Sequence, residues 1–140
     1  MSRVFWDTNL FIYLFEGAGE RLERVSSLLR RMVERNDKLY ASTLTLGEVL
    51  VKPLQERNES LRQTYEDALA RTAVLVPFDI EAARLYAAIR HDRTIRAPDA
   101  IQLACAAHAR VDLFITNDDR LSRAAIPGIH FVVSLKRAFL

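Results

Sequence analysis

The sequence predicts an α/β fold in which a parallel sheet lies between layers of helices. Two observations predict it: short apolar segments with strand-like composition recur along the chain, and longer stretches with helical spacing of apolar residues separate them. The length of 140 residues corresponds to about one domain, and no linker rich in Ser, Gly or Pro divides it. We therefore expect a single domain over residues 1–140.

The strands and helices are expected in alternation. The clearest helix covers residues 20–35, where Val25, Leu29 and Met32 belong to one apolar stripe. The aromatic residues around the first strand and the segment after it are expected in the core. Expected strands are residues 3–6, 39–42, 73–78, 113–116 and 130–133, and the other expected helices are 10–15, 46–57, 61–71, 80–90, 98–109 and 120–125.

Composition excludes several classes of protein. Half of the residues are hydrophobic and 27% are charged, with only 4 Gly and 4 Pro, which excludes disordered and collagen-like chains. The apolar runs are far shorter than the roughly 18 residues of a membrane span, and the first residues do not resemble a signal peptide, so we expect a cytoplasmic protein. Cys105 is the only cysteine, which excludes an internal disulfide and a zinc site of Cys/His spacing. A metal would need oxygen ligands.

The basic residues are mostly arginine. The chain has 17 Arg and 3 Lys against 18 acids, a formal net charge of +2. Guanidinium groups suit bidentate binding of phosphate, although genomic composition explains the bias equally well. If four acids were gathered in one site, 20 basic residues would face 14 acids elsewhere. Such a surface would attract a polyanion.

Acidic residues recur where the predicted strands end. Asp7, Asp79 and Asp118 follow strands, Glu48 comes shortly after another, and Asp99 begins a helix. Ligands of open parallel sheets bind at the carboxyl ends of the strands. Spacing alone does not decide which of these acids converge.

Each acid alone also fits a helix terminus. Asp7, and Asp118 or Asn117, are good N-caps. Glu48 completes a Thr-x-x-Glu capping box, and Asp99 follows a proline in a first helical turn. Gathered together, however, two such charges 4 Å apart would repel by about 4 kcal/mol. A hard divalent cation such as Mg²⁺ or Mn²⁺ would relieve that repulsion.

Four segments together resemble the acidic motifs of PIN-domain ribonucleases, and their spacing and the chain length are similar to those of VapC-type toxins of toxin–antitoxin pairs. The segments are Asp7-Thr8-Asn9, Gly47-Glu48-Val49, Pro98-Asp99-Ala100 and Thr116-Asn117-Asp118. The resemblance implies a three-layer α/β/α sandwich with strand order 3-2-1-4-5. In that order Asp7 and Asp118 are neighbours, and Asp79 lies at the edge as a cap.

The resemblance also implies a function. One or two Mg²⁺ or Mn²⁺ ions would be held by four catalytic carboxylates and would activate water for in-line attack on an RNA phosphodiester. The implied partners are an RNA substrate, a second copy of the chain and a small antitoxin whose tail covers the pocket. The implied metal ligands are Asp7, Glu48, Asp99 and Asp118, with Thr8, Asn9 and Thr116 in support and the role of Asp119 open.

Arginines near these motifs are candidates for RNA binding. Arg93 and Arg96 lie in the polar segment 90–96 before Asp99, and Arg120 follows Asp118. The alternative for 90–96 is an ordinary polar loop. No histidine has the spacing expected of a catalytic one.

Three other classes of protein share part of this pattern. A haloacid-dehalogenase-type phosphatase requires Asp-x-Asp, whereas this chain has Asp7-Thr8-Asn9. A receiver domain requires paired acids near the first strand, and none precedes Asp7. A catalytically silent module with the same fold, binding RNA or protein, would keep the acids only as caps.

Overall fold

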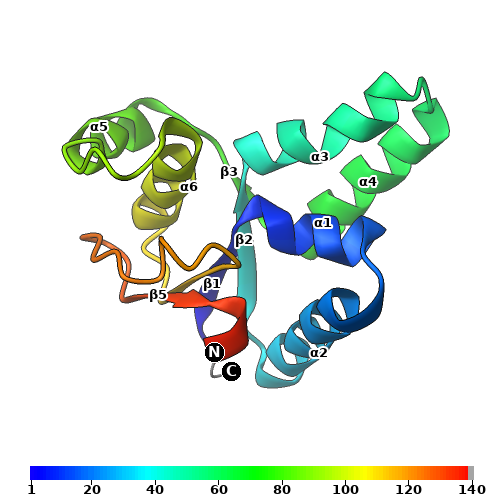
Figure 1. The fold of residues 1–140 in the computed structure, drawn as a ribbon, viewed down its shortest axis with the longest axis horizontal. Helices are drawn as coiled ribbons and strands as arrows, with labels where there is room; N and C mark the ends of the chain where they lie inside the picture. Colours follow the sequence, from blue (N-terminus) through cyan, green and yellow to red (C-terminus); the bar gives the residue numbers. More distant parts are fainter. Residues whose placement is uncertain (139–140) are drawn as a thin grey trace.

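The computed structural model describes residues 1–138, in which five strands form one parallel sheet of order β3-β2-β1-β4-β5 (Figure 1). The predicted fold class and strand order are therefore confirmed. In register, Val4 of β1 faces Leu39 of β2 and Leu113 of β4. The strands are β1 (Arg3–Trp6), β2 (Lys38–Ser42), β3 (Val74–Val76), β4 (Leu113–Thr116) and β5 (Phe131–Ser134).

Helices cover both faces of the sheet. One core lies between the sheet and α1 to α4, and a second lies between the sheet and α5 and α6 (Figure 1). The helices are α1 (Thr8–Glu16), α2 (Gly19–Arg35), α3 (Thr43–Gln55), α4 (Glu59–Thr72), α5 (Ile80–Ile89) and α6 (Ala97–His108), and a 3₁₀ turn, η1 (Leu135–Arg137), follows β5.

The central strand β1 contributes to both cores because successive side chains of a strand point to opposite faces. Phe5 packs on one face, where its ring stacks on Phe114 with centroids 5.2 Å apart. Trp6 packs on the other face, 5.1 Å from the ring of Phe11. All four rings are fully buried, which confirms the predicted core positions of Phe5, Trp6 and Phe11. Tyr13 and Phe15, which were also expected in the core, are only partly buried and pack against it.

Two helix predictions need correction. Helix α3 begins at Thr43, three residues before the predicted start, and its N-cap is Ser42, whose hydroxyl accepts a hydrogen bond from the Thr45 amide. Thr45 is therefore inside the helix, and the predicted capping box is wrong. By contrast, Asp79 caps α5 by accepting from the Ala82 amide at 3.0 Å, as expected of an edge-strand acid.

The helix expected at 120–125 is replaced by turns. Local bonds compete with a helix there: the Asp118 carboxylate accepts from the Arg120 amide, and the Ser122 hydroxyl donates to the carbonyl of Asp119. Pro127 would also limit the length of a helix in this segment, and a helix that short has only marginal stability. Among residues 1–138, no helix combines the length and apolarity that crossing a bilayer requires.

Candidate active site

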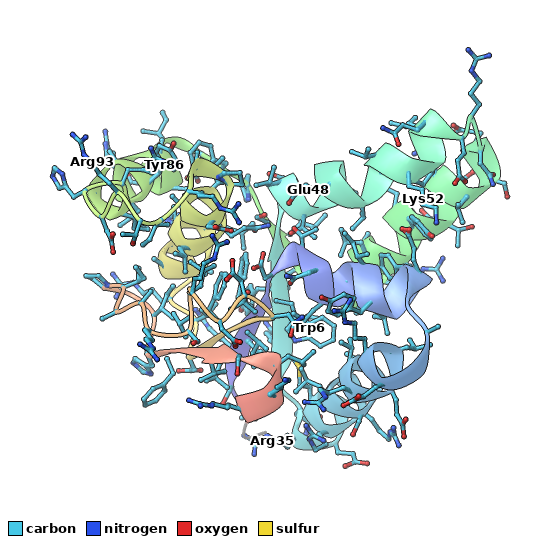
Figure 2. All side chains as sticks on the ribbon, viewed as in Figure 1. Trp6, Arg35, Glu48, Lys52, Tyr86 and Arg93 are labelled. Atoms are coloured by element: carbon cyan, nitrogen blue, oxygen red, sulfur yellow. The ribbon has the colours of Figure 1, made fainter. Side chains whose placement is uncertain are left out.

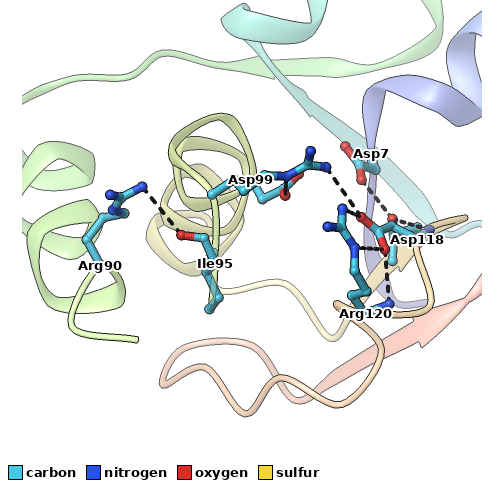
Figure 3. A network of polar contacts seen from close by, with 8 residues as sticks. Asp7, Arg90, Ile95, Asp99, Asp118 and Arg120 are labelled. Carbon is cyan, nitrogen blue, oxygen red and sulfur yellow. Dashed lines mark hydrogen bonds and ion pairs between the residues drawn. The ribbon is translucent and has the colours of Figure 1, made fainter. Parts of the chain in front are cut away.

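The carboxyl end of the sheet forms a pocket of about 390 Å³, which we call the acidic pocket. It is lined by Asp7, Glu48, Asp99 and Asp118. Asp7 follows β1 and caps α1, Glu48 lies on α3, Asp99 is in the first turn of α6, and Asp118 follows β4. The fold thus brings together four acids that lie far apart in the sequence. Glu48 is labelled in Figure 2, and the other three are drawn in Figure 3.

Asp7 is the most buried of the four acids, with 8% of its surface exposed. Its carboxylate accepts hydrogen bonds from the Thr8 amide at 2.9 Å and from the Thr116 hydroxyl at 2.7 Å. Burial nevertheless raises the pKa of Asp7 to about 6, and the neighbouring carboxylates of Asp99 and Glu48 add to the rise against the two hydrogen bonds. A cation in the pocket would offset both causes.

Glu48 is held by a buried polar network. The Thr8 hydroxyl donates to Glu48 at 2.7 Å. Since Thr8 has one hydroxyl proton, the Thr45 hydroxyl donates to Thr8, 2.8 Å away. The Gln102 amide completes the network by donating to Thr8 at 2.7 Å and to Thr45 at 2.9 Å, and its carbonyl oxygen accepts from Ser42.

Sequence reasoning missed Gln102. It is buried on α6, where every other residue from position 100 to 107 is apolar. It also follows Asp99 by three positions, which places both side chains on one face of the helix. That single polar residue on the face of the acid is the signal that could have found it.

Asp118 is bound by arginine side chains of the same chain. Arg120 donates to both carboxylate oxygens, from Nε at 3.0 Å and from Nη2 at 2.6 Å (Figure 3). Arg96 lies between two acids, with Nε 3.5 Å from Asp99 and Nη2 3.9 Å from Asp118. The hydrogen bonds from Arg120 hold the pKa of Asp118 below its usual value.

The residues of the acidic pocket fit a hard divalent cation. Asn9 lines the pocket, and its buried Oδ1 atom has no hydrogen-bond partner among the described residues. Together with the carboxylates it offers the oxygen donors that Mg²⁺ and Mn²⁺ prefer. Within residues 1–138, no three His, Cys, Asp or Glu side chains already form a compact ligand cluster. Asp118 would have to leave its arginine partners to join one.

The remaining predicted residues fall into two groups. The acidic pocket is lined by Thr8, Asn9 and Arg96. Thr116 does not line it but donates a hydrogen bond to Asp7, which does. Asp119 lines two neighbouring pockets instead, and Arg93 is exposed on the outer side of the loop after α5 (Figure 2).

The histidines His108 and His130 lie elsewhere. The imidazole of His108 is 3.5 Å from the carboxylate of Asp79, and that of His130 is 3.3 Å from Asp112. Neither residue lines the acidic pocket.

Residues 4–127 match the PIN domain family, and the chain belongs to that family. The fold is similar to that of a chain in a toxin–antitoxin complex from Klebsiella pneumoniae, at 27% identity and a TM-score of 0.70, over 90% of this chain and 94% of that one. It is also similar to a chain of VapBC2 from Rickettsia felis bound to a DNA fragment from their promoter, at 15% identity and a TM-score of 0.75, covering 94% and 98%. FitAcB from Neisseria gonorrhoeae gives 22% identity and a TM-score of 0.69, covering 96% and 99%. No curated protein matches the sequence significantly.

Proposed function

We propose that this protein is a metal-dependent endoribonuclease and the toxin of a type II toxin–antitoxin system of the VapC type. The observation that carries the proposal is the acidic pocket, where four carboxylates meet at the switch point of a PIN-domain sheet. Helix capping does not require acids to share one pocket. Burying Asp7 beside other acids costs stability, and this favours a catalytic role over the silent binding module.

Asp7, Glu48, Asp99 and Asp118 would hold one or two Mg²⁺ or Mn²⁺ ions. When bound, such an ion supplies a water of lowered pKa and positive charge opposite the scissile phosphate. Hydrogen bonds within the chain orient two of the carboxylates that would bind the metal ion. Thr116 and the Thr8 amide orient the Asp7 carboxylate, and the Thr8 hydroxyl orients Glu48.

Arg96 and Arg120 would bind the RNA substrate. Arg96 lines the acidic pocket and Arg120 binds Asp118, which lines it; both arginine side chains are about two-thirds exposed, at 64% and 63%. If Asp118 held a metal ion, Arg96 and Arg120 would be free to donate to a phosphate oxygen. Arg93 remains a candidate for a more distant phosphate contact.

The partners proposed are an antitoxin that inhibits cleavage and a second copy of this chain. The Klebsiella pneumoniae neighbour, at 27% identity, is a toxin–antitoxin complex, which supports an antitoxin here. A cytoplasmic location and a single PIN domain over residues 1–140 stay predictions.

The test is cleavage of RNA with Mg²⁺ or Mn²⁺ and its loss on chelation. Asp7→Asn and Asp99→Asn should abolish cleavage, whereas Asp79→Asn, a matched helix cap outside the pocket, should retain it. Addition of the metal should raise the Tm of the unmodified protein more than that of Asp99→Asn. Cleavage that persists in both pocket variants would contradict the proposal.

A further inference from the structure

A second surface feature, which we call the basic groove, lies along the segment that follows β4. It consists of two pockets of about 320 and 500 Å³ that adjoin each other, since both are lined by Asp119 and Lys136. Its basic side chains come from α2, the 117–123 segment and η1: Arg21, Arg24, Arg123, Lys136 and Arg137.

The groove concentrates the positive charge of the molecule. Five basic side chains line it against two acids, Glu20 and Asp119, which leaves an excess of three positive charges. The whole chain has a formal net charge of only +2, so the rest of the protein is net negative. Arg123, Lys136 and Arg137 are exposed, and within residues 1–138 no carboxylate lies within ion-pair distance of their charged groups.

The basic groove begins where the acidic pocket ends. Asp118 lines the acidic pocket, whereas its two neighbours, Asn117 and Asp119, line the groove. One short segment is therefore the wall between them. The wall is anchored because the Asn117 amide donates to the Tyr13 hydroxyl at 2.8 Å, and Arg21 lies over the Tyr13 ring at 5.0 Å.

We propose that the basic groove binds the sugar–phosphate backbone of the RNA strand whose scissile phosphate lies in the acidic pocket. This inference rests on the function proposed above and specifies where the RNA strand runs along the protein surface. None of the described residues that line the groove is aromatic, so it has no platform for base stacking. Binding there should be independent of base sequence and strongly dependent on salt.

The experiment compares two pairs of substitutions, each made in the Asp7→Asn background so that the RNA stays intact. The groove pair is Arg123→Gln with Lys136→Gln. The control pair is Arg71→Gln on α4 with Arg84→Gln on α5. It removes the same charge from positions outside the acidic pocket and the basic groove. Affinity for an unstructured oligouridylate is measured by fluorescence anisotropy over a range of salt concentrations, and thermal melting verifies folding.

The groove pair should lower affinity about tenfold at physiological ionic strength and reduce the slope of log K against log salt by about 1.4, since each lost contact removes about 0.7. In active protein it should raise KM while leaving kcat nearly unchanged. The control pair should change neither quantity appreciably. Cleavage by the unmodified protein together with equal binding by both pairs would overturn the groove but keep the nuclease.

A duplex DNA that binds as tightly, and loses as much affinity in the groove pair, would overturn the assignment to the RNA strand. Absence of any metal-dependent cleavage would instead overturn the proposed function. The two failures are therefore distinguishable.

Discussion

The Thr116 hydroxyl donates to the Asp7 carboxylate across the boundary between β4 and β1, with 2.7 Å between Oγ1 and Oδ2. Asp7 directly follows β1 and Thr116 is the last residue of β4, so each comes one position after the pair in which Trp6 faces Ile115. Thr116 also accepts from the Asp118 amide at 3.0 Å, so it connects the acids of two strands. The orientation of the most buried acid thus depends on strand pairing, and this relationship leads to the first prediction.

Stability should fall as the pH rises through the range in which Asp7 ionises. The pKa of Asp7 is about 6 in the folded protein against the ordinary Asp value of 3.8, so between these two pH values the folded state holds a proton that the unfolded chain has lost. Full ionisation above pH 6 costs about 3 kcal/mol. Asp7→Asn should therefore raise the free energy of unfolding by about 1–3 kcal/mol at pH 8 and change it little near pH 4. Urea unfolding at both pH values measures this, and an equal effect at both would contradict it.

Removing Arg120 should strengthen metal binding. Its guanidinium competes with a metal ion for both oxygens of Asp118. The ion pair is exposed and therefore weak, so Arg120→Gln should lower the Kd for Mn²⁺ by only about two- to fivefold. Calorimetric titration measures the Kd, with Arg84→Gln as the control arginine. Unchanged or weaker Mn²⁺ binding would show that the Asp118–Arg120 pair does not compete with metal.

Replacing Gln102 should destabilise the protein and reduce cleavage. Gln102→Leu would fit the buried site but would leave the Ser42 hydroxyl proton without its acceptor and would remove a hydrogen-bond donor from both Thr8 and Thr45. Unsatisfied buried groups cost about 1–3 kcal/mol each, so a loss of about 2–4 kcal/mol is expected in urea unfolding. Cleavage should fall as well, because Thr8 would no longer be fixed against Glu48. Normal stability in Gln102→Leu would disprove the network's structural role.

Two glycines should respond oppositely to alanine. Gly128 has φ of +96°, and a Cβ there would lie 3.0 Å from the carbonyl oxygen of Ala107, so Gly128→Ala should cost more than about 1 kcal/mol. Gly47 lies within α3, and a Cβ there meets nothing within 4 Å. Gly47→Ala should stabilise by up to about 1 kcal/mol. Thermal melting of both variants tests this, and destabilisation by Gly47→Ala would refute the helix argument.

The limits of the sequence prediction are physical. The segments expected as strands and six of the seven expected helices are found, because hydrophobic period and strand-like composition are local properties. The prediction of a helix at 120–125 was wrong because so short a helix would need tertiary packing to be stable, and this segment forms turns. The capping box at Thr45 failed because Ser42, at the end of a strand, already serves as the cap.

The sequence by itself determined the alternation of strands and helices, the oxygen character of any metal site, and the four motif acids. Only the tertiary structure decided how these acids are held: Asp7 is buried against Thr116, and Glu48 is fixed through Thr8 and Gln102. Periodicity records which face of an element is buried. Contacts between residues about 40 to 110 positions apart depend on how the elements pack, which no local pattern contains.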